Sequence, residues 1–275
     1  APFEVSLQFS DYAKTLYVNE QTGRALFEVT NSVTFSRYML KRLDKTLNPL
    51  KYVKNEMVAL NRLPGGLAPT CHHFWEDKRF AYLLLDYVPG KSLREVFNKP
   101  LNGESDFKQR LKALEFTCKK LAQLERKKML HRDIKPENIV LEVDNGKFPN
   151  VYDAHLVDFG MSNQNRLTEE GSLGYNAPEQ RGNRNLSLTN KLDIFSLGQV
   201  GWYLLQGAPL ELEENFASDG WSELNIPHLP DFVSGKLIQL LTKCVQFDPG
   251  KRPHSANALR QVCSNIRQKN NFTRK

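Results

Sequence analysis

The chain has 275 residues, 40% of them hydrophobic and 25% charged, which is the ordinary composition of a globular protein with one large domain or two lobes. No apolar run approaches the ~18 residues that span a bilayer, so we expect no membrane segment. The net charge of +7 comes from scattered Lys and Arg without a run of five like charges. This pattern predicts a solvated basic surface and gives no specific nucleic-acid signal.

Four cysteines are spaced widely along the chain, with no Cys-x-x-Cys pair and no spacing typical of metal ligands. We therefore expect buried, reduced thiols, as in a cytoplasmic protein. The first residues contain neither a basic segment nor an apolar leader, although a secreted effector acting in a host cytosol would carry a domain of the same kind. The cysteines are Cys71, Cys118, Cys244 and Cys263.

The first third of the chain has the periodicity of strands followed by one helix. Residues 3–30 alternate apolar and polar side chains in short runs, with turn signals at 19–23. A third strand is predicted at 35–43, and sequential hairpins would join these strands into an antiparallel sheet. The segment 49–63 has the spacing of an amphipathic helix. Its face includes Tyr52, Val53, Glu56, Met57 and Leu60.

The remaining elements are mostly helical. The apolar run 80–88 predicts a buried strand that enters a Pro-Gly turn, and Ser92 is a candidate N-cap for a short helix. A long helix is predicted at 107–128, and its apolar stripe is typical of core packing. Short strands at 139–141 and 155–157 predict a hairpin. The stripe consists of Leu111, Leu114, Cys118, Leu121 and Leu124.

A polar motif between the long helix and the hairpin carries the residue types that phosphoryl transfer needs. Such a transfer depends mainly on positioning and on positive charge near the phosphate oxygens. Asp133 can receive or orient an acceptor hydroxyl, and Lys135 offers a cation beside it. Mg²⁺ prefers hard oxygen ligands, which the Asn138 amide and the Asp158 carboxylate provide. The motifs read His131, Arg132, Asp133, Ile134, Lys135, Pro136, Glu137, Asn138, and then Asp158, Phe159, Gly160.

Together these motifs resemble the catalytic and metal-binding loops of eukaryotic-type Ser/Thr protein kinases, and the likeness runs from about Val5 to Ile266 in family order. It implies an α+β, bilobal protein-kinase-like fold. The N-terminal lobe would have an antiparallel five-stranded sheet with one helix, and the C-terminal lobe would be mainly helical. The implied parts are an N-lobe at 1–85, a hinge at 86–90, a C-lobe at 91–268 and a flexible tail at 269–275.

The resemblance also implies roles for individual residues. Asp133 would be the catalytic base, Lys135 would steady the γ-phosphate, and Asn138 and Asp158 would hold Mg²⁺, with Mn²⁺ as an alternative ion. ATP would contact a further set of positions, among them a lysine held by a glutamate, a gatekeeper, two hinge backbone groups and the floor of the adenine pocket. These are Lys41, Glu56, Gly23, Met39, Leu85, the Asp86 carbonyl, the Val88 N–H and Val140.

The glycine-rich loop of the family is eroded in this chain. Only Gly23 remains, in the place of the third glycine. Asn19 and Gln21 would crowd the phosphates, and Glu20 adds negative charge beside them. A pseudokinase that acts as a scaffold or allosteric partner therefore stays open as an alternative function.

The segment that ends at Ala177, Pro178 and Glu179 resembles the activation segment of Ser/Thr kinases. Arg132 precedes the base and could pair with a phosphate on this segment. Glu169 and Glu170 could supply that negative charge permanently instead. The resemblance further implies that Asp193 accepts hydrogen bonds from the catalytic loop and that Arg252 pairs with Glu179. The hydroxyls open to phosphorylation are Ser162, Thr168 and Ser172.

The sequence thus predicts a monomeric Ser/Thr protein kinase that transfers the γ-phosphate of ATP to a protein hydroxyl. A small-molecule kinase with the same fold is a second alternative. The Lys135-Pro136 pair and the 171–175 match argue against it. The substrate, the regulator and the role of the insert at 144–153 are not predicted.

Overall fold

The computed structural model describes residues 13–144, 149–160, 171–181, 188–215, 220–221 and 224–272. It divides into two compact units with a boundary between Val88 and Pro89. Strand character predicted before residue 13 lies outside the described residues, as do Ser162, Thr168, Glu169 and Glu170. No described helix has both the length and the apolar character needed to cross a membrane.

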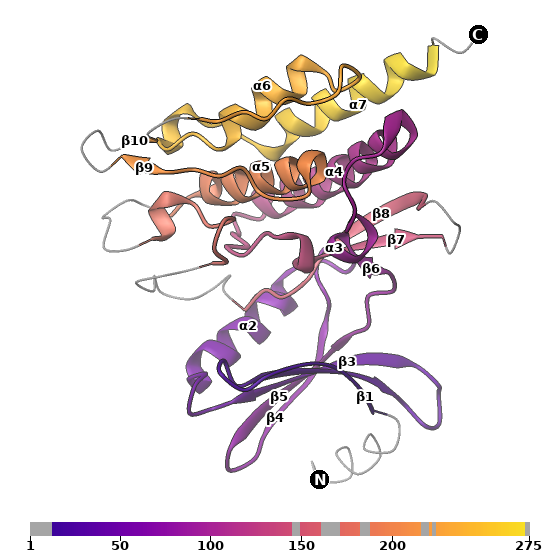
Figure 1. The fold of residues 1–275 in the computed structure, drawn as a ribbon. Coiled ribbons are helices and arrows are strands. Elements are labelled where there is room, and N and C mark those ends of the chain that lie inside the picture. Colours follow the sequence, from indigo (N-terminus) through magenta and orange to yellow (C-terminus); the bar gives the residue numbers. More distant parts are fainter. Residues whose placement is uncertain are drawn as a thin grey trace. The chain divides into compact units, whose positions relative to one another are not determined.

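The first unit is an antiparallel five-stranded sheet with the strand order β1-β2-β3-β5-β4, and one helix, α2, accompanies it (Figure 1). The predicted α+β character and the five-stranded sheet are confirmed. Alternation of side chains along each strand buries Val29 and Leu84 on one face of the sheet. The elements are β1 (Ala13–Asn19), β2 (Arg24–Thr30), β3 (Arg37–Asp44), α2 (Leu50–Arg62), β4 (Cys71–Glu76) and β5 (Phe80–Asp86).

The predicted start of the third strand at Phe35 is wrong. Asn31 closes the turn before β3, because its side-chain oxygen accepts hydrogen bonds from the N–H groups of Val33 and Thr34, both at 2.9 Å. Phe35 has a φ of +57° and donates its N–H to the Asn31 carbonyl at 2.9 Å. Its ring is 78% exposed, so this aromatic residue belongs to the turn and not to the sheet.

The turn after β3 is closed by the carboxylate of Asp44. Its Oδ1 accepts hydrogen bonds from the N–H of Thr46 at 3.0 Å and from the Thr46 hydroxyl at 2.7 Å. Its Oδ2 accepts one from Arg79 Nε at 2.8 Å. The Thr46 hydroxyl and N–H, together with Arg79, lower the pKa of Asp44 from 3.8 to about 2.

Asp44 should therefore contribute to acid resistance. Since its pKa is lower in the folded protein, its ionised form stabilises the fold fully above about pH 3.8, and this contribution is lost as the pH falls through 2. Urea unfolding of Asp44→Asn should show a deficit against wild type at pH 5–7 that shrinks below pH 4. The exposed control Asp231→Asn should show little deficit at any pH. A deficit for Asp44→Asn that is constant from pH 7 to pH 2 would contradict the argument.

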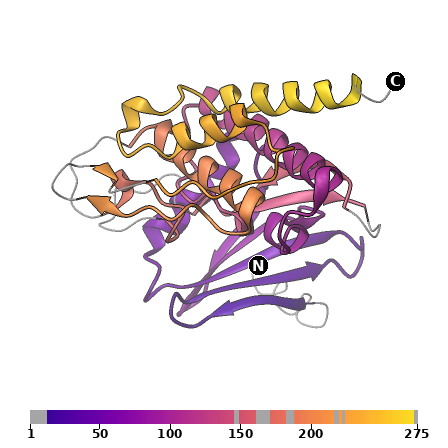
Figure 2. The same ribbon diagram turned by 45° about the horizontal axis from the view of Figure 1, so that its top comes forward.

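The second unit is mainly helical, and Figures 1 and 2 show its long helices lying beside one another. Helix α4 packs against α7, α5 and strand β8, and its predicted apolar stripe is buried. The helices are α3 (Leu93–Val96), α4 (Gly103–Arg126), α5 (Asn190–Gln206), α6 (Gly235–Cys244) and α7 (Ala256–Phe272). The strands are β6 (Lys91–Ser92), β7 (Ile139–Val143), β8 (Val151–Leu156), β9 (Glu214–Asn215) and β10 (Gly220–Trp221).

Helix α4 begins four residues before the predicted start at Phe107. Its first turn is polar, and Asp106 accepts the N–H of Asn102 at 3.0 Å, so the helix starts where no apolar periodicity marks it. It ends at Arg126 because Lys128 adopts a φ of +55°. Ser92 caps α3 as predicted, in a reciprocal arrangement with Glu95.

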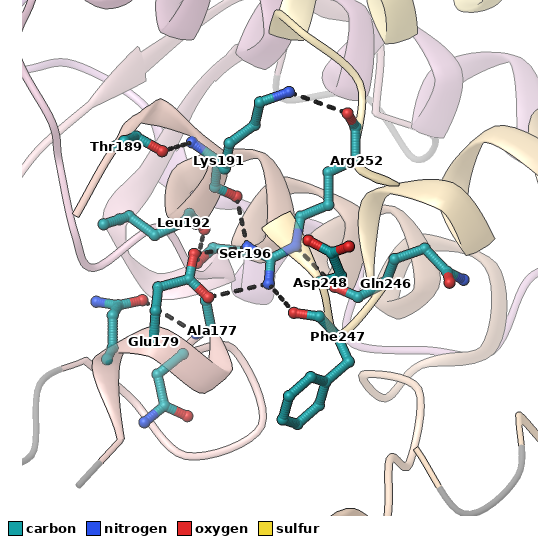
Figure 3. A network of polar contacts seen from close by, with 12 residues as sticks. Ala177, Glu179, Thr189, Lys191, Leu192, Ser196, Gln246, Phe247, Asp248 and Arg252 are labelled. Carbon is teal, nitrogen blue, oxygen red and sulfur yellow. Dashed lines mark hydrogen bonds and ion pairs between the residues drawn. The ribbon is translucent and has the colours of Figure 1, made fainter. Parts of the chain in front are cut away.

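A buried ion pair joins distant parts of the second unit (Figure 3). Arg252 Nη1 and Nη2 donate to the two carboxylate oxygens of Glu179 at 2.7 and 2.9 Å, which confirms the predicted pair. The other N–H groups of the guanidinium reach backbone carbonyls, so all five donors of Arg252 are used. The two side chains are 0% and 1% exposed. The carbonyls belong to Gln246 at 2.7 Å, Lys191 at 3.0 Å and Phe247 at 2.8 Å.

Candidate active site

In the first unit, the Lys41 ammonium and the Glu56 carboxylate form a buried ion pair, with 2.7 Å between Nζ and Oε1. Lys41 lies on the central strand β3, opposite Leu26 of β2 and Leu83 of β5. Glu56 lies on the buried face of α2 with Val53 and Leu60, which is the face that its helical spacing predicts. Lys41 is 5% exposed and Glu56 3% exposed. Burying two charges is costly, so the pair is weak evidence for stability and stronger evidence for a site.

Gly23 lies in the turn between β1 and β2, with a φ of +64°. A Cβ atom at this position would lie 2.7 Å from the Asp44 Cβ. Its carbonyl also accepts the N–H of Asp44 at 2.7 Å, and the Asn19 side chain accepts the N–H of Thr22 at 3.0 Å. The turn therefore needs glycine at 23 for its own geometry, whatever this residue does for a nucleotide.

The other predicted nucleotide contacts of the first unit lie on β3, on β5 and just after β5. Met39 of β3 pairs with Leu85 of β5, and Leu85 is buried. Asp86 donates its N–H to the Thr70 carbonyl at 3.0 Å, and its carboxylate accepts the Thr70 N–H at 2.8 Å. The strand end is thus fixed by contacts that the sequence did not reveal. Val88 is the last residue of the unit before the boundary.

In the second unit, three polar side chains converge on the carboxylate of Asp133. Its Oδ1 accepts a hydrogen bond from the Ser172 hydroxyl at 2.9 Å. Its Oδ2 accepts one from Asn138 Nδ2 at 3.0 Å and lies 3.1 Å from Lys135 Nζ. Lys135 in turn donates to Ser172 Oγ at 2.7 Å. The predicted base and the predicted phosphate-binding lysine are therefore neighbours, and Ser172 bridges them.

Ser172 is placed by its glycine neighbour. Gly171 has a φ of +80°, and a Cβ atom there would lie 2.9 Å from the Asn176 Cβ and 3.2 Å from the Arg132 carbonyl oxygen. A larger residue would force the segment away from the catalytic loop. The sequence indicates Ser172 as a hydroxyl open to phosphorylation and as the counterpart of the threonine in the matching kinase stretch; its contact with Asp133 is a finding of the structure.

The backbone of the catalytic loop is held by Asp193 of α5. Its carboxylate accepts the N–H groups of His131 and Arg132, each at 2.8 Å, as predicted. Burial raises the pKa of Asp193 to about 7, against the lowering effect of these two N–H groups. Arg132 adopts a φ of +68°, and Gln180 donates to its carbonyl at 2.8 Å.

His131 joins the catalytic loop to the loop that carries Asp158. Its Nε2 donates to the Val157 carbonyl at 3.1 Å, and its ring lies 4.6 Å from the Phe159 ring. Burial lowers the pKa of His131, so the neutral imidazole is favoured at neutral pH. The Val157 N–H also donates to the Asn138 carbonyl at 3.0 Å. The two loops are therefore fixed to each other.

Asn138 and Asp158 fit the ligand set that Mg²⁺ prefers. Asn138 uses its amide nitrogen on the carbonyl and the carboxylate of Asp133, at 2.9 and 3.0 Å. This orientation leaves its amide oxygen to serve as a metal ligand. Asp158 is held at a φ of +62° on the adjoining loop and supplies a carboxylate. Val140, the predicted floor of the adenine pocket, follows on β7 opposite His155.

Comparisons with known proteins show the family of this chain. A family model for the protein kinase domain matches residues 23–263. The chain is 28% identical over 240 residues to a probable serine/threonine-protein kinase of Dictyostelium discoideum, covering 80% of the chain and 31% of the relative. It is 30% identical over 205 residues to probable serine/threonine-protein kinase 2 of Plasmodium falciparum, covering 71% and 39%.

An Aurora kinase of Schizosaccharomyces pombe is 29% identical over 209 residues, covering 74% of the chain and 55% of the relative. The chain thus spans between about a third and a little over half the length of these three relatives. The family model covers most of the chain, and the motifs at 131–138 and 158–160 fall within it. The chain therefore belongs to the protein kinase domain family.

Proposed function

We propose that this domain is an active serine/threonine protein kinase that transfers the γ-phosphate of ATP to a protein hydroxyl. The observation that carries the proposal is the group around Asp133, where an ammonium and an oriented amide each lie within hydrogen-bond distance of one carboxylate. The names of the similar kinases support Ser or Thr as the acceptor. We also propose that the domain is monomeric and acts in a cytosol.

In this mechanism, Asp133 orients the acceptor hydroxyl and receives its proton as the oxygen attacks the γ-phosphorus. Lys135 balances the negative charge on the transferring phosphoryl group, and ADP leaves with the bond electrons. Bound Mg²⁺ would neutralise charge on the phosphate oxygens, with Asn138 and Asp158 as its protein ligands. Lys41 would hold the α- and β-phosphates, and Glu56 would hold Lys41.

The remaining nucleotide contacts complete the proposal. Met39, Leu85 and Val140 would contact the adenine ring, and the Asp86 carbonyl and Val88 N–H would meet its polar edge. Gly23 would pass close to the phosphates. These six assignments depend on the family pattern, and substitutions that change nucleotide affinity would test them one by one.

A pseudokinase that serves as a scaffold or allosteric partner is the second candidate. The observation in its favour is the geometry of the β1–β2 turn. Gly23 packs closely against Asp44, and the Asn19 side chain forms a hydrogen bond within the turn. Weak nucleotide binding would follow if that turn keeps this geometry. The buried Lys41–Glu56 pair argues for the enzyme, because a scaffold has no use for so costly an arrangement.

A peptide-library transfer assay tests the proposal directly. With γ-labelled ATP and Mg²⁺, we expect label on peptides that contain Ser or Thr and little on matched peptides with Tyr. A parallel thermal-shift series with Mg²⁺-ATP separates the alternatives. Stabilisation by nucleotide without transfer would favour a nucleotide-binding pseudokinase, and neither effect would favour a scaffold. Transfer to Tyr peptides alone would contradict the acceptor assignment.

A further inference from the structure

A second group of ionisable side chains lies on the β7–β8 hairpin of the second unit, where His155 is the cross-strand partner of Val140. Glu142 of β7 pairs directly with Asp153 of β8. His155 follows two positions after Asp153, so the two side chains share one face of the strand. Each of the three residues offers a ligand atom, and these atoms all lie within 4.8 Å of one another.

The contacts inside this group leave one buried carboxylate oxygen without a hydrogen-bond partner among the described residues. His155 Nε2 lies 2.6 Å from Glu142 Oε1. Asp153 Oδ2 lies 3.0 Å from the ammonium of Lys120 on α4. The other oxygen, Asp153 Oδ1, is buried, and among the described residues no hydrogen-bond partner reaches it. An ion pair between His155 and Glu142 would explain two of the three side chains but not this orphaned oxygen.

We propose that Glu142, Asp153 and His155 form a binding site for a divalent transition-metal ion, with Zn²⁺ as the best match. One imidazole nitrogen and two carboxylates are a ligand set that Zn²⁺ accepts, with water in the fourth position. The Glu142 side chain is 42% exposed, so an ion can reach the site from solvent. Mg²⁺ prefers an all-oxygen set, and the imidazole therefore separates this site from the proposed catalytic one.

The bound ion would link β7 to β8. These strands carry Val140 on one side of the hairpin and lead into the Asp158 loop on the other. The ion would fix the strand pair that carries Val140, the cross-strand partner of His155. The site does not depend on kinase activity, so it could exist in a pseudokinase as well.

Lys120 is the charge that opposes metal binding. Its ammonium neutralises Asp153 through the contact at 3.0 Å, so an ion bound to Asp153 would meet this positive charge. Removing a like charge at this distance should raise the affinity for a cation about tenfold.

The test is a calorimetric titration of the full chain with ZnCl₂ in excess Mg²⁺ and without nucleotide, with visible absorption of Co²⁺ as a second readout. We expect one Zn²⁺ site in the wild type. His155→Gln should weaken binding on the order of a hundredfold, and Glu142→Gln should weaken it at least tenfold. Lys120→Met should strengthen it. His73→Gln, at an exposed histidine on β4, is the matched control and should bind like wild type.

Thermal unfolding in a chelator shows whether each variant is folded before metal is added. Folded His155→Gln that binds Zn²⁺ as tightly as wild type would overturn the proposal. So would a His73→Gln control that loses as much affinity as His155→Gln, or a wild type that binds no Zn²⁺. Should His155→Gln fail to fold, the loss of affinity expected for the exposed Glu142→Gln decides the question.

Discussion

Replacing Asp158 with alanine should abolish phosphate transfer while the fold survives. Asp158 supplies the carboxylate of the proposed Mg²⁺ site, and it lies on the loop that His131 and Asn138 fix to Asp133. A metal ion that stabilises the transition state by several kcal/mol accounts for about 10³-fold or more in rate. We therefore expect kcat for peptide phosphorylation to fall by at least that factor. Single-turnover transfer from γ-labelled ATP measures it.

The exposed Asp231→Ala is the matched control, since it removes the same side chain from the same unit. It should keep wild-type activity. Thermal unfolding of Asp158→Ala without nucleotide should stay close to wild type, whereas the extra stabilisation by Mg²⁺-ATP should be lost. Normal transfer by a folded Asp158→Ala would rule out the metal assignment, and with it the proposed role of Asn138.

The sequence predicts those parts of the fold and the site that depend on local patterns. Period-2 alternation predicts the sheet, and helical spacing predicts that Glu56 lies on the buried face of α2, where it meets Lys41. The motif at 131–138 predicts that its polar residues converge because they are close in the chain. The pair of Arg252 with Glu179 is also predicted, but only through the family pattern.

Contacts that follow neither a periodic pattern nor the family resemblance could not be predicted from the sequence. The Ser172 hydroxyl reaches Asp133 across 39 positions, and no periodicity marks that contact. The start of β3 is set by the Asn31 side chain, which closes the preceding turn. Phe35 lies in that turn, and its high strand propensity makes it resemble a strand residue.

The metal-binding group on the hairpin depends on strand register across the insert at 144–153. A register shift after Glu142 sets Glu142 against Asp153, and one residue of slip would place these side chains on opposite faces. Spacing along the chain gives no metal-ligand pattern at these three residues. Glu142 lies on β7, and Asp153 and His155 lie on β8. Spacing along the chain does not determine how these two strands pair.

Replacing Arg252 with methionine should destabilise the protein by about 3–5 kcal/mol, because breaking a buried ion pair from one side leaves an uncompensated charge. The Glu179 carboxylate would lose both of its hydrogen bonds from the guanidinium. The carbonyls of Gln246, Lys191 and Phe247 would lose donors as well, and each lost bond to a buried group adds to the cost. Urea unfolding at neutral pH measures the change in the free energy of unfolding.

A double-mutant cycle separates the pair from the packing around it. Glu179→Leu alone should also destabilise the fold, since it leaves Arg252 buried without its anionic partner. The double variant Arg252→Met/Glu179→Leu should cost clearly less than the two single variants together, because neither charge then remains unpaired. Arg260→Met, at an exposed arginine on α7, is the matched control and should change stability by no more than about 0.5 kcal/mol. Additive single-variant costs would mean that the backbone carbonyls, and not the carboxylate, are the partners of Arg252 that matter.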